Sequence, residues 1–468
     1  MKTHYDIAIV GAGPAGMAAA SIAAEHDVSV LLLDEQNDAG GQIYRAVSRQ
    51  NITDRSILGP DYYKGQDLVS ELRSSGAEHI TGATVWQVSP EREIGISKDG
   101  KAWMVTADQV IIATGAQERP FPVPGWTLPG VMSAGGAQVA LKSSGLAEPD
   151  AVFAGSGPLL LLVAYQYMKA GIPIRAILDT TPRINLLRAL PHLPSALTSI
   201  GELIKGRHWI ASLVTAGIPF IKGVEDLKLL GEDAVTKVEY RIGKRWHKID
   251  TTHVFLHQGV VPNVNLAMSA GCAHNWSKVQ LCWHAQTDRW AESDIQGIAI
   301  AGDGVAIGGA LAAEHQGRIA AFGALHRCGA LKSVERDSLA APFRKALSRE
   351  LRLRPFLDAI FQPPKHLRIP EGEDTIVCRC EEVPAALIRD SVALGCVGPN
   401  QLKSFSRCGM GPCQGRFCGL TVSEMIAEAC GVPVSEVGAY RLRPPVKPLM
   451  LGELAALNAE PGSTPGDG

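Results

Sequence analysis

The chain has 468 residues, more than one hydrophobic core usually serves, so two or three domains are expected. Hydrophobic residues make up 46% and charged residues 20% of the sequence, which excludes a disordered or fibrous protein. Lys and Arg (45) nearly balance Asp and Glu (47), for a net charge of -2. This balance provides no overall field for nucleic acid or an anionic membrane, and neither is an expected partner.

The first residues, MKTHYDIAIVGAG, enter an expected strand within five positions and leave no room for a secretory signal. The longest apolar run, PLLLLVAYQYM, is shorter than the roughly 18 to 20 residues that a membrane-spanning helix needs. We therefore expect a cytoplasmic protein with no integral membrane segment, peripheral at the inner membrane at most and only through partners. In a reducing cytosol, clustered cysteines usually hold metal or carry out redox chemistry.

Residues 5–35 predict a β-α-β unit that binds a dinucleotide. A buried strand leads into the turn GAGPAG and a small-residue helix. Gly11 permits the tight turn, Gly13 lets the backbone approach a pyrophosphate, and Gly16 allows the helix to pack closely on the strand. The amino end of the helix then offers free N–H groups and a partial positive charge to the phosphates.

A second strand is expected over 28–33, and two acids follow it. An acid at this position accepts hydrogen bonds from a ribose hydroxyl. Asp34 is favoured over Glu35 because Asp34 directly ends the apolar run. The strand, the turn, the helix and the acid some twenty residues on are therefore all present, which makes a coincidental glycine loop the weaker interpretation.

Two later stretches indicate which nucleotide is bound. VIIATGA (110–116) is a strand that runs into a small-residue turn, and GIAIAGDGVAIGGALAAEHQGRIAA (297–321) is a strand, a Gly-Asp pair and a helix. With the first unit they resemble the thioredoxin reductase and glutathione reductase superfamily over about residues 1–330. In that superfamily the aspartate that matches Asp303 bonds the ribityl chain of FAD. The alternative is a nucleotide-binding fold without flavin. The resemblance assigns FAD, or another adenine nucleotide, to Gly11, Gly13, Pro14, Ala15, Gly16, Asp34, Glu35, Gly41, Gln42, Ala113, Thr114, Gly115, Gly302 and Asp303.

A second dinucleotide unit opens at DAVFAGSGPLLLL but departs from the usual pattern. Gly155 and Gly157 are present, whereas Leu160 stands where a third small residue is expected. A leucine there displaces the helix or fills space that a nucleotide needs. Asp179 lies at the ribose-acid position but alone does not restore the pattern. We expect a degenerate NAD(P)-type domain, with a working nicotinamide site as the less favoured alternative.

The paired redox cysteines of the superfamily's disulfide reductases are missing from the sequence. The segment GGQIYRAV (40–47) has no cysteine, and Cys272 and Cys282 are ten positions apart. We expect these two thiols to be buried as small hydrophobic groups. His257 and Gln258, in a turn that resembles the return to the first domain, are expected to be hydrogen-bonded structural residues, with a role facing the flavin or a partner as the less favoured alternative.

Seven of the ten cysteines lie near the carboxyl end, in CRCEEV and SRCGMGPCQGRFCG and at positions 396 and 430. A 2Fe-2S cluster needs four thiolates. Cys378 and Cys380 with Cys413 and Cys418 supply them, or Cys408 replaces one of the later two. The segment resembles the bacterioferritin-associated ferredoxin-like domain, except that its second pair has four intervening residues rather than two. Zinc, or a site without metal, remains an alternative.

The last residues predict an extended tail. RLRPPVKPLMLGELAAL is a proline-rich strip followed by a short helix, and NAEPGSTPGDG is expected to be disordered. A strip that cannot bury itself often lies across a neighbouring subunit.

The whole chain resembles the A-type subunit of multi-subunit amino-acid and opine dehydrogenases. The resemblance implies an α/β flavoprotein with two dinucleotide-binding domains and a small, mainly helical iron-sulfur domain. It also implies a partner subunit of amino-acid-oxidase type that carries FAD, a small ferredoxin-like subunit, and FMN as a further group at a subunit interface. The expected function is electron transfer in oxidation of an opine such as octopine or nopaline. The alternatives are a self-contained NAD(P)H-dependent reductase and a flavin-free assembly subunit.

The expected divisions are 1–120 with 286–330 (FAD), 121–285 (degenerate NAD(P)), 331–374 (helix and linker), 375–440 (2Fe-2S) and 441–468 (tail).

Overall fold

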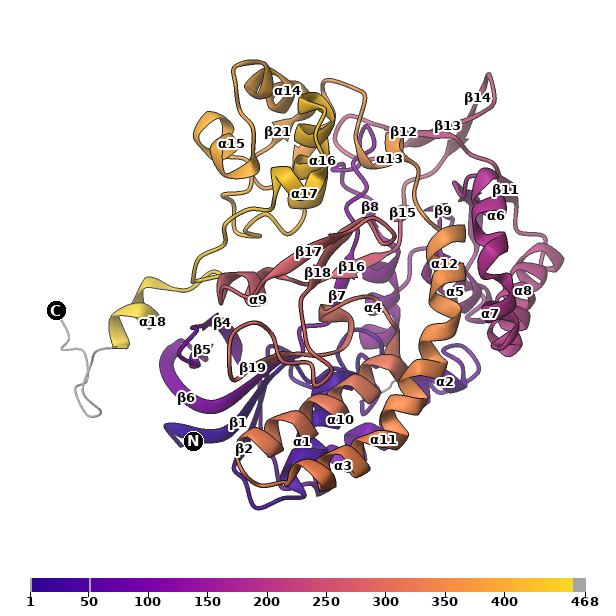
Figure 1. Ribbon diagram of the computed structural model, residues 1–468. Helices are drawn as coiled ribbons and strands as arrows, with labels where there is room; N and C mark the ends of the chain where they lie inside the picture. Colours follow the sequence, from indigo (N-terminus) through magenta and orange to yellow (C-terminus); the bar gives the residue numbers. More distant parts are fainter. Residues whose placement is uncertain (1, 50–51, 458–468) are drawn as a thin grey trace.

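The computed structural model describes residues 2–49 and 52–457 (Figure 1). Two α/β domains lie against each other, and a small cysteine-containing domain caps one end (Figure 1). The predicted fold class, with two dinucleotide-binding sheets, is confirmed. Within the described residues, no helix combines the length and apolar character needed to cross a membrane. The predicted disorder of NAEPGSTPGDG lies outside the described residues.

The first sheet has seven strands in the order β3-β2-β1-β6-β5-β4, with β19 beside β6. Its parallel strands are β3, β2, β1, β6 and β19, and the apolar run of β2 is buried at every residue. Such runs are typical of parallel strands covered on both faces. The strands are β1 (His4–Val10), β2 (Val30–Asp34), β3 (Glu78–Thr81), β4 (Thr84–Val88), β5 (Glu93–Lys98), β6 (Lys101–Ile112) and β19 (Ile298–Ile300).

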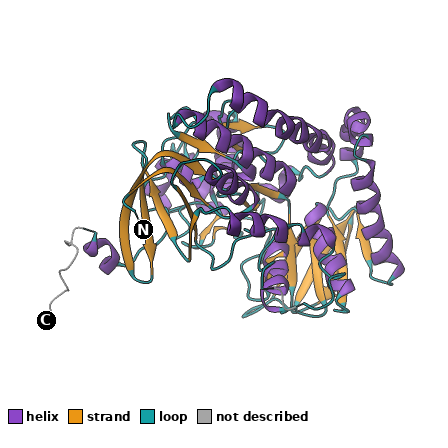
Figure 2. Cartoon of the chain, turned by 90° about the horizontal axis from the view of Figure 1, so that it is seen from below, coloured by secondary structure: helices purple, strands orange, loops and turns teal. Residues whose placement is uncertain are grey.

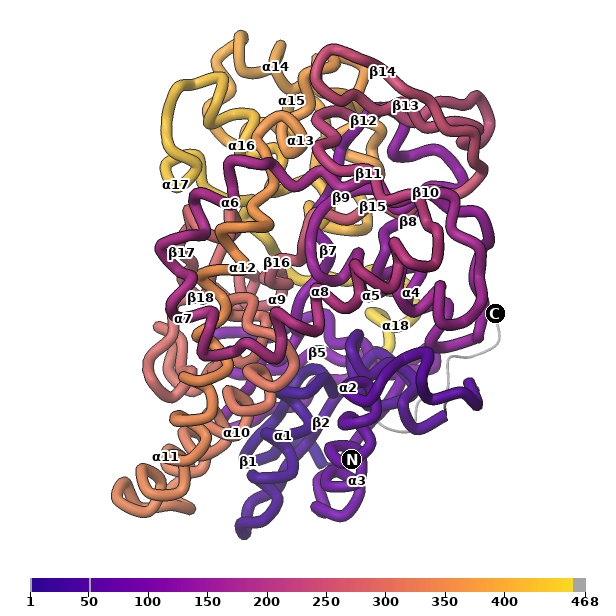
Figure 3. The backbone as a smooth tube through the Cα atoms, turned by 90° about the vertical axis from the view of Figure 1, so that its right-hand side faces the viewer, coloured from indigo at the N-terminus to yellow at the C-terminus, as the bar shows by residue number. Residues whose placement is uncertain are grey.

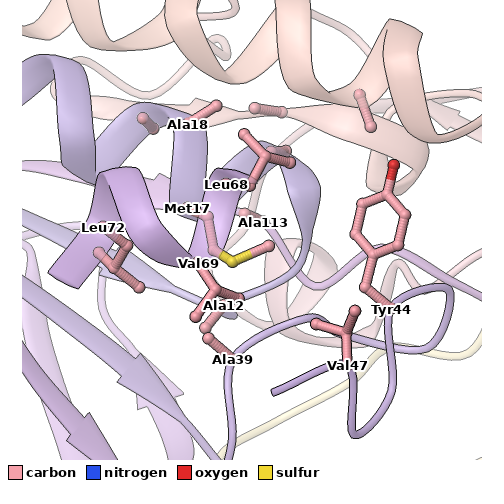
Figure 4. Close-up of a cluster of buried hydrophobic side chains, with 14 of the residues drawn as sticks. Ala12, Met17, Ala18, Ala39, Tyr44, Val47, Leu68, Val69, Leu72 and Ala113 are labelled. Atoms are coloured by element: carbon pink, nitrogen blue, oxygen red, sulfur yellow. The ribbon is translucent and has the colours of Figure 1, made fainter. Parts of the chain in front are cut away.

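Helices cover one face of this sheet and bury its largest core. Met17 lies among Leu68, Val69, Ala39 and other apolar side chains from three separate segments (Figure 4). The helices approach closely, since a Cβ added at Gly317 would lie 2.0 Å from the Ala15 carbonyl oxygen. These helices are α1 (Pro14–Ala24), α2 (Pro60–Tyr63), α3 (Gly65–Ser74), α10 (Ala310–Arg327) and α11 (Ser333–Glu350).

The second sheet is parallel throughout, in the order β11-β10-β9-β15-β8, and forms a separate group of strands in Figure 2. The rings of Phe153, Tyr167 and Phe255 meet edge to face in its core, 5.1 to 5.7 Å apart. The elements are β8 (Val131–Ser133), α4 (Ala134–Ser144), β9 (Ala151–Gly155), α5 (Pro158–Lys169), β10 (Ile174–Asp179), β11 (Phe220–Lys222) and β15 (Val254–His257).

Three smaller sheets and a helical layer complete the body. The sheet β12-β13-β14 projects beyond the second sheet, and the pairs β7-β16 and β17-β18 lie between the two domains (Figure 1). These elements are β7 (Ala116–Glu118), β12 (Asp226–Leu230), β13 (Lys237–Ile242), β14 (Arg245–Asp250), β16 (Val260–Pro262), α9 (Asn265–Ser269), β17 (His274–Ser277) and β18 (Cys282–Ala285). The outer helices are α6 (Ile184–Ala189), α7 (Leu193–Leu197), α8 (Ile200–Thr215), α12 (Arg354–Ile360) and α13 (Lys365–Arg368).

The cysteine-containing domain has its own small core. Ile388, Leu402 and Val422, from its three longer helices, are completely buried there. A buried ion pair between Arg368 and Glu424 ties the linker to this domain. The elements are β20 (Ile376–Cys378), β21 (Val383–Pro384), α14 (Ala385–Ala393), α15 (Pro399–Ser406), α16 (Gly419–Cys430) and α17 (Val434–Val437).

The tail packs on the first domain of its own chain. The Val446 N–H donates to the Trp86 carbonyl oxygen at 2.9 Å, and Lys447 pairs with Glu35 at 2.6 Å. The short helix α18 (Leu451–Ala456) lies beside β6, and the Ser97 hydroxyl donates to Glu453 at 2.7 Å. The strip therefore lies on the first domain of its own chain, although only Val446 and Glu453 of these residues are buried.

Candidate functional site

Two glycines of the first turn are required by the fold itself. Gly11 has φ of +105°, and an added Cβ would lie 2.5 Å from the Ala113 carbonyl oxygen. A Cβ at Gly16 would lie 1.8 Å from the Gly11 carbonyl oxygen. Any side chain at either position would push the helix or the neighbouring strand away. The tight turn therefore depends on these two residues whether or not a ligand is bound.

Gly13 is different, because the fold leaves space beside it. An added Cβ would meet only the Gly41 Cα, at 3.8 Å. Gly13 precedes the amino end of α1, which has no acidic residue in its first turn and no side-chain cap. The first N–H groups of a helix have no intrahelical partner, and they favour a phosphate. The open space and the uncapped helix end fit the pyrophosphate of FAD.

The two acids after β2 have different surroundings. Asp34 is buried and accepts the Ala12 N–H at 2.5 Å and the Gln36 N–H at 2.7 Å. Burial raises the pKa of its carboxyl group, against the lowering effect of these two bonds. Glu35 is exposed and pairs with Lys447 of the tail. Asp34 thus fixes the glycine turn, and its role toward a ribose stays a prediction.

The other predicted cofactor residues lie on loops around this turn. The Gly40 N–H donates to the Ala12 carbonyl oxygen at 2.8 Å, which holds the Gly40-Gly41 loop against α1. Asp303 accepts the Gly308 and Gly309 N–H groups at 2.8 and 2.9 Å, at the amino end of α10.

A cleft opens beside the carboxyl end of β2, where open parallel sheets bind ligands. Its lining includes Gln36, Asn37, Asp38, Arg45, Ala46 and Arg49. Pro14, Ala15, Gln42, Ala113, Thr114, Gly115 and Gly302 complete the predicted set, with the Thr114 hydroxyl donating to the Asn263 carbonyl oxygen at 3.0 Å.

A buried lysine, which sequence patterns did not indicate, holds this loop. The Lys142 Nζ donates to the Ile43 carbonyl oxygen at 2.8 Å and to Gln138 at 3.0 Å, and its side chain is 3% exposed. It links α4 of the second domain to the loop that carries Gly41 and Gln42. Burial lowers the pKa of Lys142 to about 7.

The Lys142→Met variant is expected to lose part of the pH dependence of stability. The folded pKa lies below the unfolded value, so the unfolded chain binds more protons between about pH 7 and pH 10. The free energy of unfolding of the natural chain should rise by about 2 kcal/mol from pH 7 to pH 9 through this group. Urea unfolding at both pH values measures the rise. The exposed Lys345→Met variant should keep it, and an undiminished rise in Lys142→Met would contradict the assignment.

The second glycine turn is filled by a side chain of the same domain. The His257 ring is buried, and its Nε2 lies 3.2 Å from the position of a Cβ on Gly157. Its Nδ1 lies 3.2 Å from Glu118, and Glu118 accepts the Gly135 N–H at 2.6 Å at the amino end of α4. Leu160 is buried in the main core. The imidazole therefore lies where a pyrophosphate would approach the backbone.

Five thiols gather in the cysteine-containing domain. The sulfur atoms of Cys378, Cys408 and Cys418 all lie within 4.8 Å of one another. Cys380 and Cys413 form a second, hydrogen-bonded pair. Cys378 thus lies beside Cys418, and Cys380 lies beside Cys413. Cys408 lies with Cys378 and Cys418. The geometry keeps both predicted ligand sets possible.

Hydrogen bonds among the three clustered thiols shift their pKa values in opposite directions. Hydrogen bonds with Cys408 and Cys418, and further bonds from the Gly409 and Glu381 N–H groups, lower the pKa of Cys378 to about 2. Hydrogen bonding with Cys378 raises the pKa of Cys408 to about 12 and that of Cys418 well above its usual value. Without metal, one thiolate is thus shared among three sulfurs. Bound iron or zinc would deprotonate its ligands.

The remaining cysteines lie apart from these five. Cys272, Cys282 and Cys396 are buried and unpaired, and Cys328 and Cys430 are partly buried. Burial raises the pKa of Cys282 to about 12 and that of Cys328 to about 11. Thiols with raised pKa values are poor nucleophiles. This agrees with the expectation that Cys272 and Cys282 are packing groups.

Hydrogen bonds hold the cysteine-containing domain close to the predicted FAD-binding residues. The Gln117 side chain, two residues beyond Gly115, donates to the Arg416 carbonyl oxygen at 3.0 Å. Arg416 lies two residues before Cys418. The Asn265 side chain donates to the Gln414 carbonyl oxygen at 3.1 Å. One side-chain bond therefore joins β7, which directly follows the predicted FAD residues Ala113, Thr114 and Gly115, to the cysteine loop.

Comparison with known proteins finds a matching family for the two α/β domains and another for the cysteine-containing domain. Residues 5–317 match the family described as pyridine nucleotide-disulphide oxidoreductase, and residues 373–458 match the sarcosine oxidase A3 domain. The opine oxidase A-subunit of Agrobacterium tumefaciens (strain Ach5) is 43% identical over 474 residues, covering 98% of this chain and 92% of that protein. The chain belongs to the opine oxidase A-subunit family.

More distant relatives share the family architecture. Hydrogen cyanide synthase subunit HcnB of Pseudomonas protegens is 30% identical over 460 residues, covering 94% of this chain and 95% of that protein. L-proline dehydrogenase from P. horikoshii has a TM-score of 0.70 at 19% identity and covers 96% of this chain and 79% of its own. Thioredoxin reductase from T. acidophilum has a TM-score of 0.51 at 19% identity, with 69% and 99% covered. The two solved structures show the fold, and this member of the opine oxidase A-subunit family is an FAD-dependent oxidoreductase chain.

Proposed function

We propose that this chain is the electron-transfer subunit of a hetero-oligomeric dehydrogenase that oxidises an opine, such as octopine or nopaline, and passes electrons to a respiratory acceptor. The name of the 43% identical relative supports the substrate class. The observation that carries the electron-transfer role is the Gln117–Arg416 bond, which joins β7, just beyond the predicted FAD residues Ala113 to Gly115, to the cysteine loop. An opine is a secondary amine, so its oxidation releases a pair of electrons.

The first dinucleotide site would hold FAD. Gly13 and the amino end of α1 would bind the pyrophosphate, Gly41 would close over it, and Asp303 would orient the ribityl chain. When bound, FAD exchanges electron pairs with reduced partners and single electrons with an iron-sulfur centre. Lys142 holds the Gln42–Ile43 carbonyls and so keeps this loop in place.

The cysteine-containing domain would hold a 2Fe-2S cluster. We assign Cys378 and Cys418 to one iron and Cys380 and Cys413 to the other; each pair is already together in the chain, and Cys408, which belongs to the same group as Cys378 and Cys418, is the alternative ligand. Backbone N–H groups that donate to Cys378 would stabilise its negative charge in the cluster. Cys408 would be a fifth, neighbouring thiol.

The substrate would be oxidised on a partner subunit. The complex would contain an FAD-bearing subunit of amino-acid-oxidase type, a small ferredoxin-like subunit, and FMN at a subunit interface. Its support is that the relatives with 43% and 30% identity are named as subunits of larger enzymes.

Anaerobic co-purification with the products of neighbouring genes tests this function. Flavin, iron and acid-labile sulfide per chain should each be stoichiometric, and octopine or nopaline should reduce the complex. Glycine and proline derivatives serve as competing substrates. Zinc without iron or sulfide would refute the electron-transfer role, and absence of flavin would leave an assembly subunit.

NADH should not reduce the isolated, flavin-loaded chain. The His257 ring beside Gly157 and the buried Leu160 occupy the second dinucleotide turn. Anaerobic mixing with NADH should leave the visible absorbance of the oxidised flavin unchanged. Dithionite provides the positive control. Rapid bleaching by NADH would instead show a self-contained reductase.

A further inference from the structure

An unusually apolar surface follows β10 along three consecutive helices. Between residues 184 and 204 only Arg188 and Glu202 are charged, although 20% of the whole chain is charged. Eight aliphatic side chains in this stretch are 36% to 61% exposed. Figure 3 looks onto this side of the molecule, where α6, α7 and α8 form the outer layer. We call this surface the aliphatic face: Ile184, Leu186, Leu187, Leu190, Leu193, Leu197, Ile200 and Ile204.

Basic groups border the aliphatic face. Residues 183–216 carry four basic residues and one acidic residue, a net charge of +3 in a chain whose total is -2. Arg183, Arg188 and Arg207 are exposed. Lys205 pairs with Asp61, an acid outside the segment. The net charge of the whole chain is therefore close to zero, whereas this surface is both cationic and apolar.

The composition of the aliphatic face indicates whether a protein partner or a lipid bilayer would bind to it. Protein interfaces are enriched in Tyr, Trp, Met and Arg near their centre, and leucine is under-represented among their energetically dominant residues. The centre of the aliphatic face consists of leucine and isoleucine alone. Trp209 lies at one end, stacked obliquely on Tyr165 with ring centroids 6.2 Å apart. Aliphatic residues with a basic border and a neighbouring Trp-Tyr pair are typical of helices that lie in a lipid interface.

We propose that the aliphatic face binds directly to the surface of an anionic phospholipid bilayer. Leucine and isoleucine side chains of α6, α7 and α8 enter the boundary between headgroups and acyl chains. Arg183, Arg188 and Arg207 meet the lipid phosphates. This contact needs neither the cysteine cluster nor a bound flavin, so it stands independently of the proposed electron transfer.

Co-sedimentation of the full chain with vesicles tests the proposal. The chain should bind vesicles of phosphatidylcholine and phosphatidylglycerol, and bind vesicles of phosphatidylcholine alone more weakly. The double variant Leu187→Glu and Ile204→Glu should bind about tenfold less or weaker still, because it loses two aliphatic groups that the bilayer would bury. Leu394→Glu, at an exposed leucine of the cysteine-containing domain, should bind as the natural chain does.

A second variant separates charge from burial. Arg188→Gln with Arg207→Gln should lower binding to the anionic vesicles and leave the weaker binding to neutral vesicles unchanged. Thermal melting of each variant checks its folding, which these exposed positions should not disturb. Equal sedimentation of the aliphatic variant and the natural chain would overturn the proposal. A chain that ignores vesicles but forms a dimer broken by Leu187→Glu would overturn it too, in favour of a protein interface.

Discussion

Replacing Cys418 by alanine should remove the iron from the purified chain. Its sulfur lies within 4.8 Å of Cys378 and Cys408, and it is assigned to one iron of the proposed cluster. Loss of one of four thiolates should lower iron and sulfide to about a tenth or less of the natural content. Opine-dependent reduction of an external acceptor by the complex should fall by about a hundredfold or more, because the single-electron centre is lost. Metal analysis and turnover measure the two effects.

The same series identifies the ligands. Cys378→Ala, Cys380→Ala and Cys413→Ala should behave as Cys418→Ala does, whereas Cys408→Ala should keep its iron. Cys430→Ala is the matched control, since it is a thiol of the same domain outside the five. Iron retained in Cys413→Ala or Cys418→Ala but lost in Cys408→Ala would show that Cys408 is a ligand. The assignment made here would then be wrong.

Replacing Gly13 by valine should remove FAD and leave the fold intact. An added Cβ meets only the Gly41 Cα, at 3.8 Å, so the fold leaves space for a Cβ at this position. The pyrophosphate needs that room. We expect the dissociation constant for FAD to rise by about a hundredfold, which corresponds to about 2.7 kcal/mol. Flavin content after dialysis and titration of the apoprotein with FAD measure it.

Two other glycines separate binding from folding. Gly16→Ala would force a Cβ to 1.8 Å from the Gly11 carbonyl oxygen, so this variant should lose stability even without flavin. Gly206→Val, on α8 with nothing within 4 Å of the new Cβ, should keep both FAD and stability. If Gly13→Val retains FAD with unchanged affinity, the first turn is not the cofactor site.

Local patterns in the sequence were sufficient for the first β-α-β unit. Its glycines, apolar strand and terminal acid are close in the chain, and their spacing alone constrains the backbone. The fold class is confirmed for the same reason, since each sheet begins with such a unit. The closeness of Cys378 and Cys418, forty positions apart, was also expected from the resemblance to a ferredoxin-like domain.

Contacts between distant residues could not be predicted in this way. The His257 ring lies over Gly157 because β15 and β9 are neighbours in the second sheet, one hundred residues apart in sequence. Lys142 reaches the loop at Ile43 only after two domains have packed together. Spacing also gave no means of choosing between Cys408 and Cys413, because the number of intervening residues does not show which thiol turns inward.

The tail joins the first domain to a segment that is translated much later than the domain's own strands. The Trp86 carbonyl, the Ser97 hydroxyl and Glu35 are bonded to residues 446–453. At ribosomal rates of about 5 to 20 residues per second, these partners emerge some tens of seconds after β6. A nascent chain must therefore keep that sheet surface uncovered during most of its synthesis. Premature termination near the carboxyl end would affect the domain made first.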